Sequence, residues 1–101
     1  MNINTTTSGT VATIHMSGRF DFNAHRSFKE AYDTVLKQKS ITSIEINLAG
    51  VDYLDSSALG MLLLLRERAE SEGKSVILVR PNATLLQILD IANFKKLFTI
   101  R

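Results

Sequence analysis

The sequence has no cysteine, which excludes disulfide bonds, thiol catalysis and zinc sites built from cysteine. It also has no tryptophan and no extended basic run, and its 12 Lys and Arg against 10 Asp and Glu leave a net charge of only +2. An excess this small gives no reason to expect nucleic-acid binding. The absence of cysteine is compatible with a reducing compartment, and we expect a cytoplasmic protein.

Long hydrophobic segments are missing as well. The longest wholly apolar run covers residues 58–65 and includes Gly60. It is less than half of the roughly 20 residues that a membrane-spanning helix needs. Residues 1–10 are polar and contain no Lys or Arg, so no signal peptide is expected. We therefore expect no membrane insertion.

Motifs that carry chemistry are scarce. With only five glycines, the chain has neither a Walker A nor a G-x-G-x-x-G pattern, which removes the usual phosphate cradles. The serine stretch at residues 55–58 does not match the G-x-S-x-G elbow of hydrolases. The two histidines, His15 and His25, lack the spacing of a metal-binding pair, and structural or surface roles are expected for both. We therefore expect no enzyme activity, no cofactor and no metal site.

What is present suits a small soluble domain. The chain has 101 residues, of which 45% are hydrophobic and 22% are charged. This length allows one compact core without disulfide bonds or structural metal ions, so residues 1–101 are predicted to form a single domain.

Two strands are predicted at the start of the chain. Residues 10–17 alternate in hydrophobicity, and residues 2–7 contain Ile3 and a threonine run that suits an edge strand. The dipeptide Ser8-Gly9 predicts a two-residue hairpin turn between them. Gly18 is predicted to interrupt the second strand.

The remaining strands and the first helix follow from periodicity. Asp21 or Asn23 can cap a helix that runs to about Lys39. Its apolar stripe consists of Phe28, Ala31, Tyr32, Val35 and Leu36. Further strands are predicted at residues 44–48, 75–79 and 97–100, with a connecting loop at 49–54. The strand at 75–79 is nearly all apolar, which is typical of a central strand.

Two more helices are predicted between these strands. One begins at Ser56 or Ser57 and ends before Gly73. Because it is apolar on nearly every side, we expect little of it to face solvent. The other follows Pro81, with Asn82 as a candidate cap.

The predicted order is β(β)αβαβαβ. Right-handed crossovers between the strands then give an α/β fold, with a mixed, mostly parallel sheet of about four to five strands and about three α-helices packed against it.

The segment at residues 55–60, Asp-Ser-Ser-Ala-Leu-Gly, is the feature that most suggests a function. Its structural interpretation is a helix start, because Asp and Ser are preferred N-caps. Its functional interpretation is a switch, since a phosphate on Ser56 would meet free N–H groups at the helix start. That phosphate would also place a charge of about −1.5 to −2 beside an apolar surface near Leu59 and Met61.

The chain resembles the STAS domain of anti-sigma factor antagonists. The resemblance rests on the Asp-Ser-Ser-x-Leu-Gly element at 55–60, on Gly-Arg-Phe-Asp at 18–21, and on the strand at 44–48 followed by Val-Asp-Tyr-Leu at 51–54. The family commonly has glycine where this chain has Ala58. Alanine there should stiffen the first helical turn by up to about 1 kcal/mol without blocking a switch.

The resemblance implies partner switching without chemistry by the domain itself. The unphosphorylated form would bind an anti-sigma factor that is often a serine protein kinase, and a PP2C-type phosphatase would reverse the kinase's action. Ser56 is the implied phosphorylation site, with Ser57 as the rival. The resemblance also implies that Asp21 helps to contact the partner and that Asp55 and Ser57 flank the site. We further expect Ala58, Leu59 and Met61 to bind the partner, because part of the apolar stripe near Leu59 and Met61 is expected to be exposed. A monomer or weak dimer is expected.

Two other functions stay open. Some single STAS domains are accessory subunits of ABC-type lipid transporters and need no phosphorylation, although the retained serine pair argues mildly against this role. Alternatively, the chain is an unrelated structural scaffold whose Asp-Ser-Ser segment only caps a helix.

Overall fold

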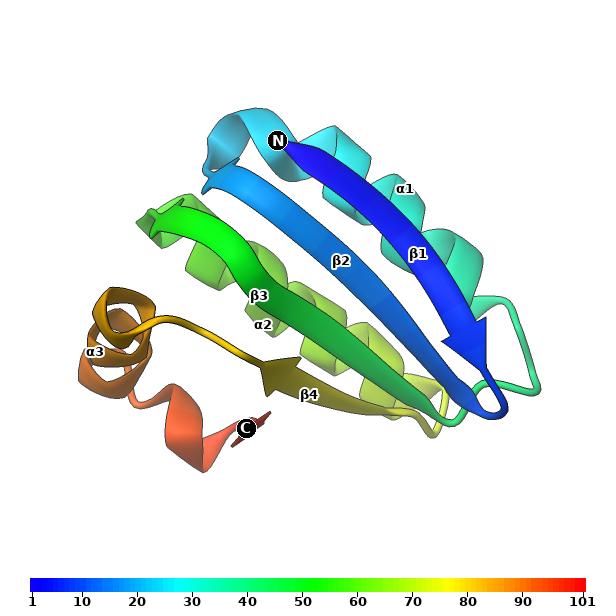
Figure 1. Cartoon of the computed structure of the whole chain (residues 1–101). Coiled ribbons are helices and arrows are strands. Elements are labelled where there is room, and N and C mark those ends of the chain that lie inside the picture. The colour runs from blue at the N-terminus through cyan, green and yellow to red at the C-terminus, as the bar shows by residue number, and fades with distance from the viewer.

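A computed structural model describes residues 1–101 and shows a five-stranded sheet with three α-helices (Figure 1). The elements are β1 (Asn2–Ser8), β2 (Val11–Phe20), η1 (Phe22–Ala24), α1 (His25–Leu36), β3 (Ser43–Leu54), α2 (Ser56–Ser71), β4 (Ser75–Val79), α3 (Ala83–Ile91), η2 (Phe94–Lys96) and β5 (Thr99–Ile100). The strands lie in sequence order, β1 antiparallel to β2 and all other neighbours parallel. The predicted fold class and element order are confirmed.

The sheet has one covered face and one open face. Helices α1 and α2 lie behind the sheet in Figure 1, whereas no helix covers the face toward the viewer. The strands alternate accordingly: Ile14 on β2 and Ile46 on β3 are fully buried, while their neighbours Thr13 and Glu45 are half-buried on the other face. The hydrophobic core therefore fills the space between the sheet and the helices.

The first hairpin differs from its prediction by one residue. Ser8 still belongs to β1 and pairs with Val11, so the turn is Gly9-Thr10. Gly9 has a φ of +61°, which glycine adopts without strain at the first turn position. Gly18 does not end β2: the strand continues to Phe20, and register shifts on both sides of Ser17 and Gly18 absorb the irregularity.

Three other boundaries also differ. β3 extends through Leu54, because residues 50–54, predicted as loop, pair with the end of β2. α1 ends at Leu36, earlier than the predicted Lys39. Residues 94–96 form η2, so the last strand contains only Thr99 and Ile100. The nearly apolar β4 pairs with β3 on one side and with this short β5 on the other, so it is an internal strand as predicted, although β3 holds the middle position of the five.

Side chains cap the elements that begin at the carboxyl edge of the sheet. Asp21 accepts a hydrogen bond from the Asn23 backbone N–H at the start of η1. Asp55 caps α2, and Asn82 caps α3 through the Leu85 N–H at 2.9 Å. Both predicted helix starts are thus confirmed.

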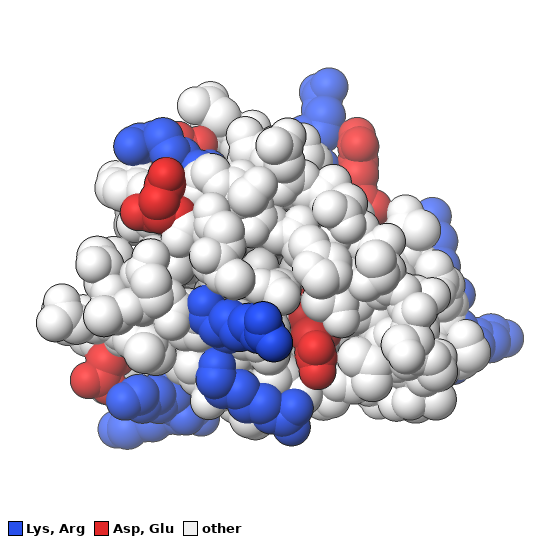
Figure 2. Space-filling view, in the orientation of Figure 1, with Lys and Arg blue, Asp and Glu red and all other residues white.

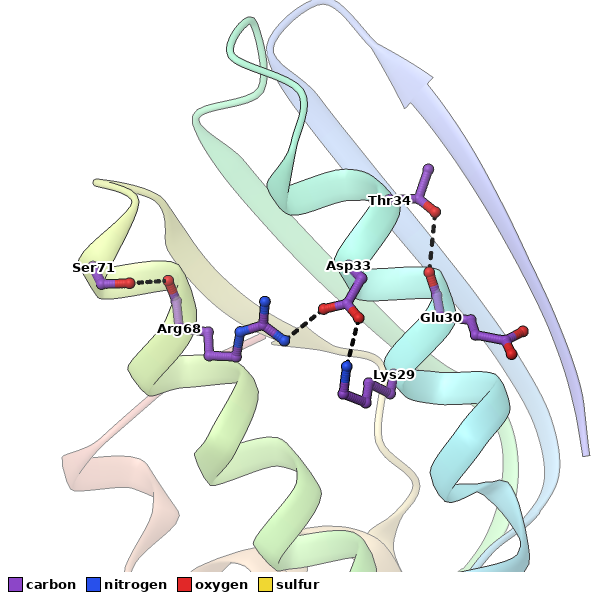
Figure 3. A network of polar contacts seen from close by, with 6 residues as sticks. All are labelled: Lys29, Glu30, Asp33, Thr34, Arg68 and Ser71. Atoms are coloured by element: carbon purple, nitrogen blue, oxygen red, sulfur yellow. Dashed lines mark hydrogen bonds and ion pairs between the residues drawn. The ribbon is translucent and has the colours of Figure 1, made fainter.

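Helices α1 and α2 are joined by a charged network (Figure 3). Asp33 of α1 accepts hydrogen bonds from Lys29 of the same helix, at 2.7 Å, and from Arg68 of α2. The guanidinium of Arg68 also lies over the Tyr32 ring. The hydrogen bond from Lys29 is the main cause that holds the pKa of Asp33 below its ordinary value; burial opposes the shift, and Arg68 adds to it.

No helix of the structure combines the length and the apolar character that a membrane span requires.

Candidate regulatory site at the start of α2

The predicted site residues meet where β2 and β3 end. These strands are parallel, and Phe20 pairs with Leu54 as the last residue of each. Asp21 and Asp55 therefore both follow the same edge of the sheet, and the Asp55 backbone N–H donates to the Phe20 carbonyl at 3.3 Å. The structure thus brings together two acidic residues that are 34 positions apart in the sequence.

Asp55 fixes the first turn of α2. Its backbone is extended, with φ −105° and ψ 179°, and its Oδ1 accepts a hydrogen bond from the Ala58 N–H at 2.8 Å. The next residue, Ser56, is the first residue of the helix and is exposed. Because the cap holds the turn in place, the Ser56 side chain is presented to solvent on an ordered backbone.

The helical repeat gives the residues after Ser56 different environments. Ser57 and Leu59 are half-buried, whereas Ala58 is fully buried. Met61 is only 7% exposed, so the expectation that it forms an exposed stripe with Leu59 is wrong. Ala58 and Met61 offer almost no surface for a partner.

Another part of α2 is exposed instead. Leu63 and Leu64 are 36% and 42% exposed, which contradicts the expectation that little of this helix faces solvent. The buried positions Ala58, Leu62 and Leu65 lie on the side that packs against the sheet, and Leu63 and Leu64 lie beyond it. An apolar sequence on every side therefore does not mean burial on every side.

A groove of about 230 Å³ runs between η1 and α2, and it is lined by Ser57, the sequence neighbour of the exposed Ser56. Its lining comes from η1, the start of α1 and α2, and consists of Phe22, His25, Ser57, Gly60, Met61 and Leu64. Met61 contributes to this lining despite its low exposure. We call this feature the η1–α2 groove.

Phe22 of η1 and His25 of α1 form the aromatic part of the groove lining. Phe22 is 68% exposed, and its ring stacks on the His25 ring with a centroid distance of 6.1 Å. Sequence reasoning missed Phe22, His25 and Leu64 as site residues. Helical spacing could have placed Leu64 on the same face of the helix as Ser57, with Gly60 and Met61 between them. No sequence pattern indicates that Phe22 is exposed.

A cation lies beside Asp21, one of the two capping acids. The Arg19 Nε lies 3.7 Å from Asp21 Oδ2, and its guanidinium lies 4.1 Å from the centroid of the Tyr53 ring. Arg19 and Tyr53 are neighbours across β2 and β3, at the ends of the strands. The site thus combines a hydroxyl, two carboxylates, one guanidinium and an apolar groove, and it holds no group of His, Asp and Glu residues that could bind a metal ion.

Comparison with known proteins identifies the family. The family model described as "Mlab, STAS domain" matches residues 3–99. The chain belongs to the STAS family. A STAS-domain-containing protein of Pseudomonas aeruginosa strain UCBPP-PA14 is 45% identical over 94 residues, which cover 91% of this chain and 89% of the relative. An anti-sigma F factor antagonist of Lysinibacillus sphaericus is 25% identical over 79 residues, covering 78% of this chain and 68% of the relative.

Solved structures share the fold. A putative anti-sigma factor antagonist of Thermotoga maritima matches this STAS domain with a TM-score of 0.85 and 21% identity, over 97% of this chain and 84% of that one. The Bacillus protein SpoIIAA matches in its unphosphorylated and phosphorylated forms, with TM-scores of 0.76 and 0.75 and 19% identity. These matches cover 99% of this chain and 87% and 91% of the two SpoIIAA chains.

The family assignment confirms two predictions. The resemblance to anti-sigma factor antagonists is real in both sequence and fold. The STAS antagonist family consists of non-enzymatic regulatory proteins, so this STAS domain is not an enzyme.

Proposed function

We propose that this protein is an anti-sigma factor antagonist whose partner binding is controlled by phosphorylation of Ser56. Unphosphorylated, its single STAS domain sequesters an anti-sigma factor that is also a serine kinase; phosphorylated, it releases that partner. A PP2C-type phosphatase restores the binding form, and the cycle takes place in the cytoplasm. The observation that carries this proposal is the exposed Ser56 on a capped helix start, directly before Ser57, which lines the η1–α2 groove.

A phosphate on Ser56 is compatible with the fold. At the first residue of α2 it lies near backbone N–H groups that lack helical partners and near the positive end of the helix dipole. The cap from Asp55 already satisfies the Ala58 N–H, so the helix start is ordered before and after modification. Phosphorylation is therefore expected to change the surface of the domain and not its architecture.

The same phosphate is unfavourable for docking. It adds a charge of about −1.5 to −2 beside an apolar groove and next to the Asp55 carboxylate. A partner that buries Phe22 and Leu64 would have to desolvate that charge as well. Retained order and altered surface together support a binding switch.

An in vitro kinase assay tests which serine is phosphorylated. Purified variants are incubated with ATP and the anti-sigma factor kinase encoded in the same genome. Wild type and Ser57→Ala are expected to accept one phosphate, which phosphopeptide mapping places on Ser56, whereas Ser56→Ala accepts none. If Ser56→Ala is phosphorylated like wild type and Ser57→Ala is not, the switch residue is Ser57 and the assignment to Ser56 is wrong.

Partner binding by charge variants tests the consequence. Ser56→Asp is expected to bind the anti-sigma factor weakly or not at all. Ser56→Ala is expected to bind it constitutively, whether or not the kinase is active. Ala83→Asp is a matched control, because Ala83 is the exposed first residue of α3 and also follows a side-chain cap. Ala83→Asp is expected to bind like wild type. Co-purification with an ABC ATPase and a permease, without a kinase, would instead identify a transporter subunit.

A further inference from the structure

β1 forms one edge of the sheet and lacks the usual protection of an edge strand. Its seven residues, Asn-Ile-Asn-Thr-Thr-Thr-Ser, include no charged side chain and no proline. Its pairing with β2 is continuous from Asn2 to Ser8 without a bulge, and only Ile3 is half-buried. Proteins guard edges with lysine, proline, bulges or very short strands, because free backbone groups otherwise recruit another strand.

The opposite edge of the same sheet is guarded. β5 contains only Thr99 and Ile100, and it is flanked by Lys95 and Lys96 of η2 and by Arg101. Figure 2 shows basic side chains along the lower border, where α3 and η2 lie in Figure 1, and an uncharged surface over β1. One sheet therefore has a short, basic edge and a long, uncharged edge.

The hairpin turn determines which backbone groups of β1 are free. Ser8 and Val11 flank the two-residue turn and form a hydrogen-bonded pair. Hydrogen-bonded and non-hydrogen-bonded pairs alternate along an antiparallel ladder, so Thr6 and Asn4 also bond to β2. The N–H and C=O groups of Ile3, Thr5 and Thr7 consequently point away from β2, toward the open edge.

We propose that β1 pairs antiparallel with β1 of a second copy of this chain, about a two-fold axis at Thr5. In this register Thr5 faces Thr5 of the second copy, and Ile3 faces Thr7 of the second copy. The free N–H and C=O groups of these residues then form the new ladder. The two five-stranded sheets become one continuous sheet.

Several features favour a second copy as the occupant. The strand has no charge, so two copies meet without repulsion, and it has no charge that would select an acidic or basic partner strand. Antiparallel pairing about one residue is self-complementary and places β-branched side chains opposite one another, which stabilises sheets.

On the covered side of the sheet, the second copy would contact Ile3 within a mostly polar groove that includes Glu30 of α1. Ile3, Thr5 and Thr7 pair with the buried β2 residues Met16, Ile14 and Ala12, so their side chains lie on the helix side. A groove of about 530 Å³ runs there between residues 1–5 and the Ser27, Glu30 and Ala31 side of α1. The second copy's strand would lie along this groove and cover Ile3.

The proposed dimer leaves the regulatory site free. The η1–α2 groove involves neither β1 nor the residues that line the β1–α1 groove. This inference therefore does not depend on the proposed function, and a negative result for one says nothing against the other.

Sedimentation velocity of the full chain, from micromolar to millimolar concentrations, tests the proposal. The wild type is expected to shift toward twice its 11.2 kDa mass as the concentration rises. Thr5→Lys, which places like charges at the axis, and Thr5→Pro, which removes one free N–H, are expected to remain monomers. The matched control Thr5→Val keeps the N–H and a β-branched side chain, and it is expected to dimerise.

Amide hydrogen exchange supplies a second readout. The Ile3, Thr5 and Thr7 amides should gain protection with concentration in the wild type and lose it in Thr5→Lys, whose circular dichroism shows whether the fold is intact. A wild type that remains a monomer throughout would overturn the proposal. A dimer that persists in both Thr5→Lys and Thr5→Pro, or that Thr5→Val abolishes, would overturn it equally.

Discussion

Phe22 and Leu64 are exposed apolar side chains on either side of the η1–α2 groove, next to the serine that we propose as the switch. Large apolar groups that gather at a groove commonly anchor a protein partner. In contrast, Ala58 of the same helix is fully buried, and Met61 lines the groove but is only 7% exposed. The sequence motif therefore predicts where the proposed switch lies. It does not predict which side chains of α2 are exposed, because that depends on how the helix packs against the sheet.

Phe22→Ala is expected to weaken binding of the anti-sigma factor about fivefold or more, since truncating an anchor commonly costs over 1 kcal/mol of binding free energy. The free energy of unfolding should change little, because the side chain is 68% exposed. Isothermal titration calorimetry measures the affinity. Ile91→Ala is the control, because Ile91 is 84% exposed on α3 and lies outside the groove. Equal losses in the two variants would contradict an anchor role for Phe22.

The starts of α2 and α3 were the most predictable boundaries of the fold, whereas α1 begins at His25 without a side-chain cap. Asp55 and Asn82 were expected as caps, and both accept the hydrogen bonds that a cap requires. The ends of elements were harder to place. The loop predicted at residues 49–54 is strand because β2 continues past Gly18 and supplies partners for it, and such non-local pairing leaves no local pattern.

Asp55→Ala is expected to lower the free energy of unfolding by about 1 kcal/mol, because the Ala58 N–H loses its acceptor. Asp55→Asn keeps an acceptor at the cap and should be nearly as stable as the wild type. Chemical denaturation measures both values, with Asn82→Ala as a matched loss of the cap on α3. If Asp55→Ala were as stable as the wild type, the cap would not hold the first turn of α2.

The contact between α1 and α2 gives a pH-dependent prediction. The pKa of Asp33 is lowered in the folded state, chiefly by the hydrogen bond from Lys29, so the ionised carboxylate stabilises the fold. This stabilisation is fully present above the ordinary Asp pKa of 3.8 and is lost as the pH falls through the lower, folded-state value. Asp33→Asn should therefore be less stable than the wild type at neutral pH.

The difference between Asp33→Asn and the wild type should shrink as the pH falls below about 4, the ordinary pKa of an aspartate. Urea denaturation at a series of pH values measures this difference in the free energy of unfolding. Glu70→Gln is the control, because it removes the exposed ion pair between Glu70 and Arg66. A stability difference that is independent of pH would show that the charge of Asp33 is not what joins the two helices.

The sheet as a unit was predictable in class and strand order, because alternating strand and helix patterns permit few right-handed arrangements. The candidate site was predictable from the sequence only in part. Crossover topology places Asp21 and Asp55 at one edge, as the resemblance implied, but the groove arises from η1, a short element that has no signature in the sequence. With a net charge of only +2, one phosphate changes the charge of the protein substantially, yet its position beside the groove is what should control binding.

The most direct measurement compares the affinity of the anti-sigma factor for two homogeneous preparations of this STAS domain, one unphosphorylated and one phosphorylated at Ser56 alone. Isothermal titration calorimetry should show binding by the unphosphorylated form and at least about a tenfold weaker affinity, or 1.4 kcal/mol, for the phosphorylated form. Equal affinities of the two forms would contradict a switch at Ser56.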